Sequence, residues 1–387
     1  MKRRTLLICF ALGLLLLGTA ATVYYWRVIN QPEQATTARQ DAVSERVVVA
    51  PTPRLSDEER KLLTEQRTGN YEAHRLYLAG RDHWAKADEA GLKKGIESFQ
   101  QAIALDPGFA QAYVKLASSY AALGFGSYVS PREAWAKGKA AVIKALELDG
   151  TIAEAHAVLA DLKLFYDRDW PGAEREYQRA IELDSNDAAA HLGYHRYLLA
   201  GGRFDEAAAE WKRALELDQL SPRVVTDVAF AYFVGRRYDE AIAQCRVALK
   251  MDSSFGRAHT VLGEAYEQKG MHGEAIAEFQ EAGKSPGGGK ESLAALGHAY
   301  ALSGDRPKAM KTLEELKRLA LKEYVSPYDM ARVYIGLGEK DQAFKWLAKA
   351  DEERAGMMIY LKVHPQLDSL RSDPRFAGLL QSILLAR

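Results

Sequence analysis

The stretch AHTVLGEAYEQKGMHGEAIAEFQEA, residues 258–282, decides the fold of this chain. Leu262 and Tyr266 share one face of a predicted first helix, and Gly270 ends that helix, because glycine adopts the left-handed conformation easily. Phe279 lies on the inner face of a predicted second helix, between small residues. Small residues let antiparallel helices approach closely, and large side chains fill the remaining space. The stretch therefore predicts a helical hairpin.

The same unit recurs at a fixed interval of 34 residues. The recurring residues are Ala173, Ala207, Ala241, Ala275, Ala309 and Ala343 in one series, and Asp184, Asp218 and Asp252 in another. A period kept over so many intervals predicts stacked structural repeats. We expect about eight units between Tyr71 and Arg354. Extra residues within GFGSYVSPRE (124–133) and a turn longer by about one residue at Asp167–Gly172 predict loops on one rim.

This pattern resembles the tetratricopeptide repeat (TPR), with its large-x2-Leu-Gly-x2-Tyr and Ala-x3-Phe-x2-Ala signature. The resemblance implies an all-α, right-handed superhelical solenoid over residues 56–355, closed by a C-terminal capping helix over residues 356–387. The order of segments also resembles the extracytoplasmic TPR region of bacterial membrane-spanning signalling proteins. We expect the effector domain of those proteins to be missing, which would leave the sensing or scaffolding half.

The N-terminus predicts a membrane anchor. Lys2, Arg3 and Arg4 precede an uncharged stretch, residues 5–26, which as a helix would span about 33 Å. The positive charges predict a cytoplasmic N-terminus and a periplasmic repeat region, so we expect a single-pass protein of the cytoplasmic membrane. Residues 1–27 would form this anchor and residues 28–55 a disordered linker. The alternative is a cleaved signal peptide and a protein secreted to the periplasm.

Composition argues against several classes of function. Lys and Arg together number 52 and equal Asp and Glu at 52, so we expect no nucleic-acid partner, which requires a cationic face. Two cysteines, Cys9 and Cys245, cannot form a zinc site, and Cys245 is predicted to be a buried core thiol. No catalytic constellation or cofactor motif is found, so we predict a protein that is not an enzyme.

One pair of histidines is the only candidate for metal binding that the sequence offers. His191 and His195 are four residues apart on one helix and could face one ion. However, His156, His191 and His259 share one repeat position that a bulky residue usually fills. We therefore favour packing, and a metal-dependent enzyme is the weakest alternative function.

The binding residues are predicted from the family resemblance. In TPR arrays the first helix of each unit lines a concave groove. The matching residues are Leu164, Phe165, Leu192, Arg196, Leu199, Thr226, Phe230, Phe233, Thr260, Glu264, Glu267, His298 and Arg332. Aromatic residues in the middle of the groove predict a docked peptide or helix. The alternative for each residue is packing between repeats.

The predicted function is therefore a membrane-tethered extracytoplasmic TPR scaffold that binds a protein or peptide in its groove. Fold alone does not name the partner. A second hypothesis is a sensory or regulatory subunit acting on a separate membrane signalling protein. The Lys and Asn pattern of chaperone-binding TPR carboxylate clamps is not present.

Overall fold

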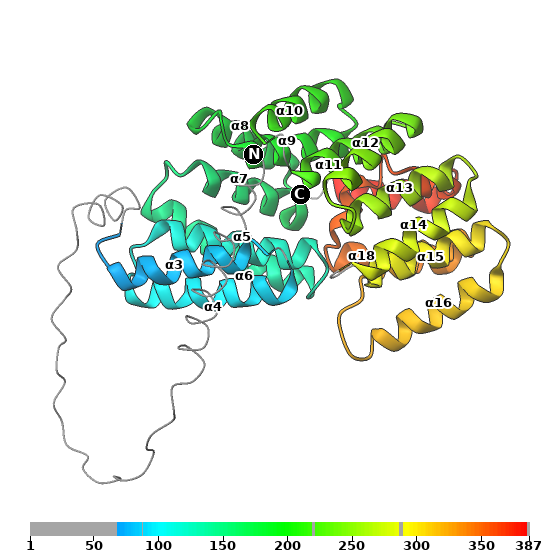
Figure 1. The fold of residues 1–387 in the computed structure, drawn as a ribbon, viewed down its shortest axis with the longest axis horizontal. Helices are drawn as coiled ribbons and strands as arrows, with labels where there is room; N and C mark the ends of the chain where they lie inside the picture. Colours follow the sequence, from blue (N-terminus) through cyan, green and yellow to red (C-terminus); the bar gives the residue numbers. More distant parts are fainter. Residues whose placement is uncertain (1–67, 87, 219–220, 286–288, 385–387) are drawn as a thin grey trace, which may run out of the picture. The chain divides into compact units, whose positions relative to one another are not determined.

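A computed structural model describes residues 68–86, 88–218, 221–285 and 289–384 of the chain (Figure 1). All described residues belong to one compact unit. None of the described residues lies in a β-strand. The all-α prediction is therefore confirmed.

The described α-helices from α3 to α18 form eight consecutive pairs. The pairs are α3 (Tyr71–Trp84) with α4 (Glu89–Leu105), α5 (Ala110–Phe125) with α6 (Pro131–Leu148), α7 (Ala153–Leu162) with α8 (Trp170–Leu183), α9 (Ala188–Gly201) with α10 (Phe204–Leu217), α11 (Pro222–Val234) with α12 (Tyr238–Met251), α13 (Gly256–Gln268) with α14 (His272–Lys284), α15 (Gly289–Leu302) with α16 (Arg306–Leu319), and α17 (Pro327–Gly336) with α18 (Lys340–Glu352). Each pair packs against the next, which is the architecture of a TPR-like solenoid.

Close helix approach explains the alanine series. All six alanines at the 34-residue spacing are buried. The glycine of the signature also allows neighbouring helices to approach closely. A Cβ atom added to Gly263 would lie 2.5 Å from the Phe279 ring. A Cβ atom added to Gly193 would lie 2.6 Å from the Tyr177 ring. A larger residue at position 263 would force α13 and α14 apart, and one at position 193 would force α9 away from α8 of the preceding pair.

The aspartate series ends the second helices. Asp106, Asp149, Asp184 and Asp252 each follow directly after a second helix, and each carboxylate accepts a hydrogen bond from the backbone N–H two residues later. This side-chain turn leads the chain into the next repeat. The recurrence of Leu-Asp in the sequence is therefore a signal for the turn between repeats.

The single extra residue lies in a π-helical turn. Residues Lys163–Asp167 form this turn, η1, at the end of α7. A π turn accommodates one additional residue without breaking the helix, and such turns are often found at functional sites. From the sequence we predicted the extra residue in the turn at Asp167–Gly172. In the structure it lies in the π-helical turn at the end of α7.

The chain beyond α18 does not form one continuous helix over residues 356–387. Two short 3-10 turns, η2 (Gly356–Tyr360) and η3 (Pro365–Leu370), precede α19 (Pro374–Leu384). Proline begins η3 and α19, since it is tolerated only in the first turn of a helix. We call residues 356–370 the C-terminal segment. Helix α19 packs beside α18, and Trp170 donates a hydrogen bond of 2.8 Å to the carbonyl oxygen of Ile383.

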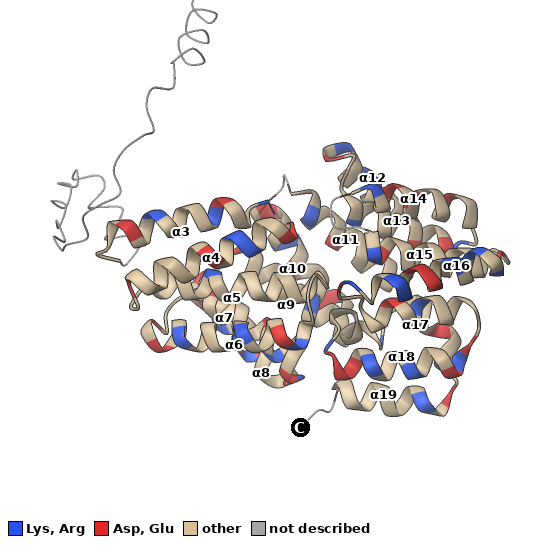
Figure 2. Cartoon of the chain, turned by 90° about the horizontal axis from the view of Figure 1, so that it is seen from below, with Lys and Arg blue, Asp and Glu red and all other residues tan. Residues whose placement is uncertain are grey.

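The predicted localisation as a single-pass membrane protein must be corrected. Among the residues that the structure describes, no helix combines the length and apolar character needed to cross a bilayer. The longest described helix, α6, has 18 residues and carries Arg132, Glu133 and Lys137, whose burial in lipid would be costly. Charges of both signs occur along the described helices (Figure 2). The predicted span, residues 5–26, and the linker, residues 28–55, lie outside the described residues.

Candidate functional site

The structure buries almost the whole predicted groove. Of the predicted groove residues, Arg196 is partly buried and the others are buried, with Phe233 and Leu164 fully enclosed. Packing between repeats accounts for part of this burial. A second cause is a segment of the same chain that lies against the first helices.

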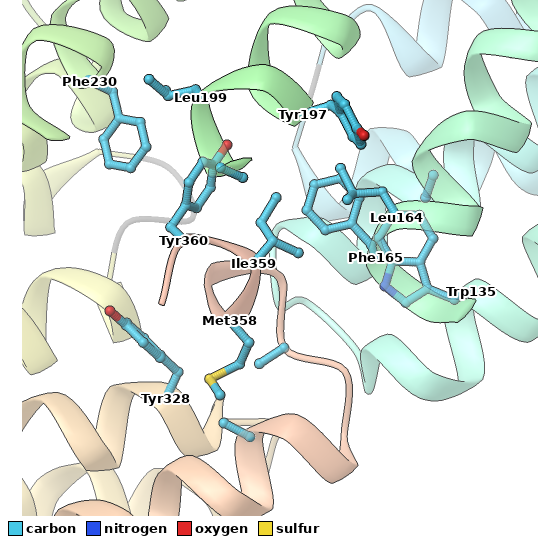
Figure 3. Packing of buried hydrophobic residues seen from close by; sticks show 14 of the residues in the cluster. Trp135, Leu164, Phe165, Tyr197, Leu199, Phe230, Tyr328, Met358, Ile359 and Tyr360 are labelled. Carbon is cyan, nitrogen blue, oxygen red and sulfur yellow. The ribbon is translucent and has the colours of Figure 1, made fainter. Parts of the chain in front are cut away.

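Aromatic contacts attach the C-terminal segment to the groove. The Phe230 ring meets the Tyr360 ring edge to face, with 5.1 Å between the ring centroids. The Phe233 and His364 rings are also nearly perpendicular, with centroids 5.3 Å apart. Figure 3 shows Tyr360 beside Phe230. It also shows Ile359 between Tyr360 and the side chains of η1. These residues belong to one continuous apolar cluster with the repeats. The aromatic part of the groove is therefore filled by the protein itself.

Polar contacts fix the same segment at several points. Glu267 on α13 accepts a hydrogen bond of 2.6 Å from the Gln366 amide, and its other oxygen lies 2.9 Å from Nδ1 of His298. The ammonium group of Lys362 donates to the carbonyl oxygen of Gly201 at 2.7 Å. These bonds satisfy groups that burial would otherwise penalise. They also link the segment to two different repeats, at α9 and α13.

A buried ion pair lies beside this contact. Nη2 of Arg332 on α17 lies 2.8 Å from Oε1 of Glu264 on α13, and both side chains are almost fully buried. Burial raises the pKa of Glu264 to about 7, while the positive charge of Arg332 opposes that rise. Removing one partner of such a pair leaves an uncompensated buried charge, which is strongly destabilising. The two residues act in the structure as a link between repeats two positions apart.

Three of the histidines form the same bridge in three repeats. The Nδ1 pairs are His156 with Glu176 at 2.7 Å, His191 with Glu210 at 2.6 Å, and His259 with Glu278 at 2.6 Å. Each Nε2 lies 3.1 Å from a backbone carbonyl oxygen six residues earlier. The ring thus joins the turn before the first helix to the side of the second helix. Sequence spacing indicated their common position but not this hydrogen-bonded role.

The His191 and His195 pair does not converge on a metal position. Both ring nitrogens of His191 are used in its bridge, and Nδ1 of His195 lies 2.9 Å from the carbonyl oxygen of Ala207. In the part of the chain with described coordinates, no group of three His, Cys, Asp or Glu residues could hold a metal ion. Cys245 is buried, as predicted, and burial raises the pKa of its thiol.

A pocket of about 370 Å³ lies away from the aromatic groove. Residues of α4, α15, α16 and the loop after α5 line it, among them Glu89, Tyr128, Leu293 and Glu315.

Charged residues at one repeat position remain accessible on the first helices. Arg223, Arg257 and Glu291 are spaced by 34 residues at the starts of α11, α13 and α15. Arg223 and Glu291 are exposed, and the Arg257 side chain is 28 % exposed. We call these three residues the open rim. They were absent from the predicted groove set, although their spacing is the signal that could have found them.

Comparison with known proteins agrees with this architecture. Residues 162–223 and 229–289 match the tetratricopeptide repeat family. Residues 162–289 contain tetratricopeptide repeats. The matched residues extend from the end of α7 to the start of α15. TPR arrays serve as protein-interaction scaffolds, so the coarse functional prediction of a protein-binding scaffold is supported. Among curated protein sequences, none matches this TPR chain significantly.

Solved structures similar to this TPR chain share its fold. The Cut9–Hcn1 complex of the APC/C is 16 % identical, with a TM-score of 0.55 over 85 % of this chain and 59 % of the other. A monomeric IFIT1 variant bound to Gppp-AAAA is 15 % identical, with a TM-score of 0.57 over 76 % of this chain and 75 % of the other. PilF of Pseudomonas aeruginosa is 21 % identical, with a TM-score of 0.43 over 61 % and 97 %. At these identities the likeness concerns the fold alone.

Proposed function

We propose that this TPR protein is a non-catalytic scaffold that binds a protein partner along its open rim, while its own C-terminal segment fills the aromatic part of the groove. The observation that carries the proposal is the contact of Phe230 and Phe233 with Tyr360 and His364. A partner that used these aromatic rings would first have to displace the segment.

Continuity of the apolar core favours a segment that stays in place. Met358, Leu361, Leu367 and Leu370 are all nearly or completely buried. Displacing the segment would expose these side chains together with the repeat residues that they cover. Apolar surface costs about 25 cal/mol for each Å² exposed, so a competing partner would have to bury both surfaces again.

The open rim has the properties of a contact surface. Its side chains project from rigid helices at a regular interval, which is how TPR arrays recognise extended partners. Within the described residues, neither Arg223 nor Glu291 has an ion-pair or hydrogen-bond partner in the chain. Unpaired charges at fixed positions give orientation and specificity to an interface. The regulatory-subunit hypothesis stays a prediction.

Position-specific photocrosslinking tests the proposal. We would introduce the photoreactive residue p-benzoylphenylalanine into the full chain at position 223 or 291, and at the outer positions 213 and 281 as matched controls. The same partner should be crosslinked from 223 and 291 and not from 213 and 281.

A fifth variant reports on the groove itself. The photoreactive residue in place of Phe230 should crosslink within the chain, to a peptide containing Tyr360. Capture of the partner from position 230 with loss of the internal crosslink would contradict the proposal, as would equal capture from the outer positions.

A further inference from the structure

The ring of His364 is enclosed between the C-terminal segment and the first helices. The residue is 1 % exposed, and its ring centroid lies 5.3 Å from that of Phe233 and 6.1 Å from that of Phe230. Neither ring nitrogen of His364 has a hydrogen-bond partner among the described residues. A buried polar group without a partner costs free energy that an apolar residue of similar shape would not, so its presence here calls for an explanation.

The backbone of His364 stands at the centre of the C-terminal segment. Its N–H donates a hydrogen bond of 2.9 Å to the carbonyl oxygen of Tyr360, and its own carbonyl oxygen accepts one of 3.2 Å from the N–H of Leu367. Nη2 of Arg371 donates to the same carbonyl oxygen at 3.3 Å. His364 therefore joins η2 to η3, and a charge on its ring would act directly on the contact that holds the segment in the groove.

The carboxylates of α11, α13 and the C-terminal segment already have other partners. The pairs are Asp227 with Arg196 and Arg257, Glu264 with Arg332, Glu267 with His298 and Gln366, and Asp368 with Arg236 and Arg371. The acidic residues of α15 and α17 are Glu291, which is exposed, and Asp329. Across the described part of the chain, no carboxylate lies within ion-pair distance of the His364 ring.

The environment of the ring disfavours a positive charge. Burial first, and then the neighbouring groups of four residues, lower the pKa of His364 well below its ordinary value; these residues are Arg332, His298, Arg371 and Arg236. The two phenyl rings offer no lone pair to the N–H groups of an imidazolium ion. The ring is therefore kept neutral while the segment is attached, whereas in water it would take up a proton near pH 6.5.

We propose that His364 makes the attachment of the C-terminal segment sensitive to acid, so that protonation of the released segment favours an open groove with Phe230 and Phe233 uncovered. The contribution of the neutral ring to attachment is complete above about pH 6.5 and is lost as the pH falls below that value. At pH 5 the equilibrium constant for release should be multiplied by up to about 30. Such a switch acts on the segment and not on the open rim, so it goes beyond the proposed scaffold function.

Two buried carboxyl groups act in the opposite direction. Burial raises the pKa of Glu264 and of Asp329 to about 7, although the positive charge of Arg332 opposes both rises. Each group thus holds a proton at acidic pH that exposure to water would release, which favours the folded state. Their contribution remains when residue 364 is replaced, so a comparison between variants isolates the effect of the ring.

Hydrogen exchange of the full chain at pH 7.5 and at pH 5, normalised to the intrinsic exchange rate at each pH, tests the switch. The measured quantity is the protection of peptides covering residues 356–370 relative to those of the outer helix α10. The variant is His364→Gln, whose amide does not titrate in this range. Between the two pH values, relative protection in the unchanged chain should fall by up to about 30-fold more than in His364→Gln.

Two further variants complete the test. His272→Gln is the matched control, since His272 lies on the outer helix α14, and it should keep the pH dependence of the unchanged chain. His364→Phe fills the site with an apolar ring and should share the pH dependence of His364→Gln even where glutamine loosens the segment at both pH values. Circular dichroism confirms that each variant is folded.

An equal pH dependence in the unchanged chain and in both position-364 variants would overturn the inference. A segment that acid protects more in the unchanged chain than in these variants would do so as well. Crosslinking from positions 223 and 291 at pH 7.5 tests the scaffold function separately, because it does not depend on release of the segment.

Discussion

Arg168 and Arg236 adopt a backbone conformation that glycine adopts in the other repeats. Both have φ near +60°, and they alternate at 34-residue intervals with glycines of positive φ. The series is Arg168, Gly202, Arg236, Gly270, Gly304 and Gly338. A side chain in the left-handed region costs about 1 kcal/mol or more. Each arginine makes a contact beyond the first helices: Arg236 pairs with Asp368 of η3, and Arg168 lies near Asp351 of α18.

Two substitutions of Arg236 separate the free-energy cost of its positive φ from the contribution of its ion pair with Asp368. Arg236→Gly removes both, whereas Arg236→Ala keeps the unfavourable φ and loses the 2.7 Å ion pair with Asp368. Both partners of that pair are largely exposed, so the pair itself contributes about 1 kcal/mol or less. We expect Arg236→Gly to be more stable than Arg236→Ala by about 1 kcal/mol, measured by urea unfolding. Asp368→Ala is the control that removes only the pair; an alanine variant as stable as the glycine variant would contradict the account.

The buried carboxyl group of Asp329 should make the stability of the folded state depend on pH. Burial, and then the negative charge of Glu291, raise the pKa of Asp329 to about 7, although Arg332 and Lys290 oppose the rise. The folded protein therefore keeps a proton that the unfolded chain loses near pH 4. This contribution to stability is complete below about pH 4 and is lost as the pH rises through about 7.

Asp329→Asn should remove this dependence. Between pH 5 and 8 the unfolding free energy of the unchanged protein should fall relative to that of the variant by up to about 3 kcal/mol. The measurement is urea unfolding of both proteins at several pH values. A difference between the two proteins that stays constant with pH would show that Asp329 is already ionised in the folded state.

At the scale of single elements, the histidine bridges should couple the two helices of a repeat. A double-mutant cycle on His259→Ala and Glu278→Ala measures the coupling directly, because the bridge joins α13 and α14 at 2.6 Å. We expect a coupling energy of about 1 kcal/mol at neutral pH. A coupling near zero would mean that the ring acts through packing alone.

The C-terminal segment should behave as part of the core. Tyr360 is 2 % exposed and contacts Phe230, so Tyr360→Ala should destabilise the folded state by about 3 kcal/mol. Lys362→Ala is the matched control, since Lys362 is exposed and makes one hydrogen bond; it should cost less than about 1 kcal/mol. Urea unfolding followed by limited proteolysis would locate the change. Equal effects of the two substitutions would argue against a packed segment.

Local patterns predicted the elements of this molecule better than its long-range contacts. The 34-residue series and the glycine at position 263 follow from packing between neighbouring helices, so the sequence reveals the repeats. The contact of Phe230 with Tyr360 joins residues 130 positions apart and leaves no periodic trace. Aromatic residues at groove positions have the same sequence pattern whether a partner or the chain's own segment covers them.

For the whole molecule, the central claim is that the C-terminal segment occupies the aromatic groove of the intact chain. Hydrogen exchange measured by mass spectrometry on the full chain tests it most directly. The amides of Leu361, Val363, His364 and Leu367 donate backbone hydrogen bonds at 3.2, 2.9, 2.9 and 3.2 Å and lie in buried residues. Peptides covering residues 356–370 should therefore exchange as slowly as those of α11 and α13. Complete exchange of these peptides within seconds, with α11 and α13 still protected, would contradict the account.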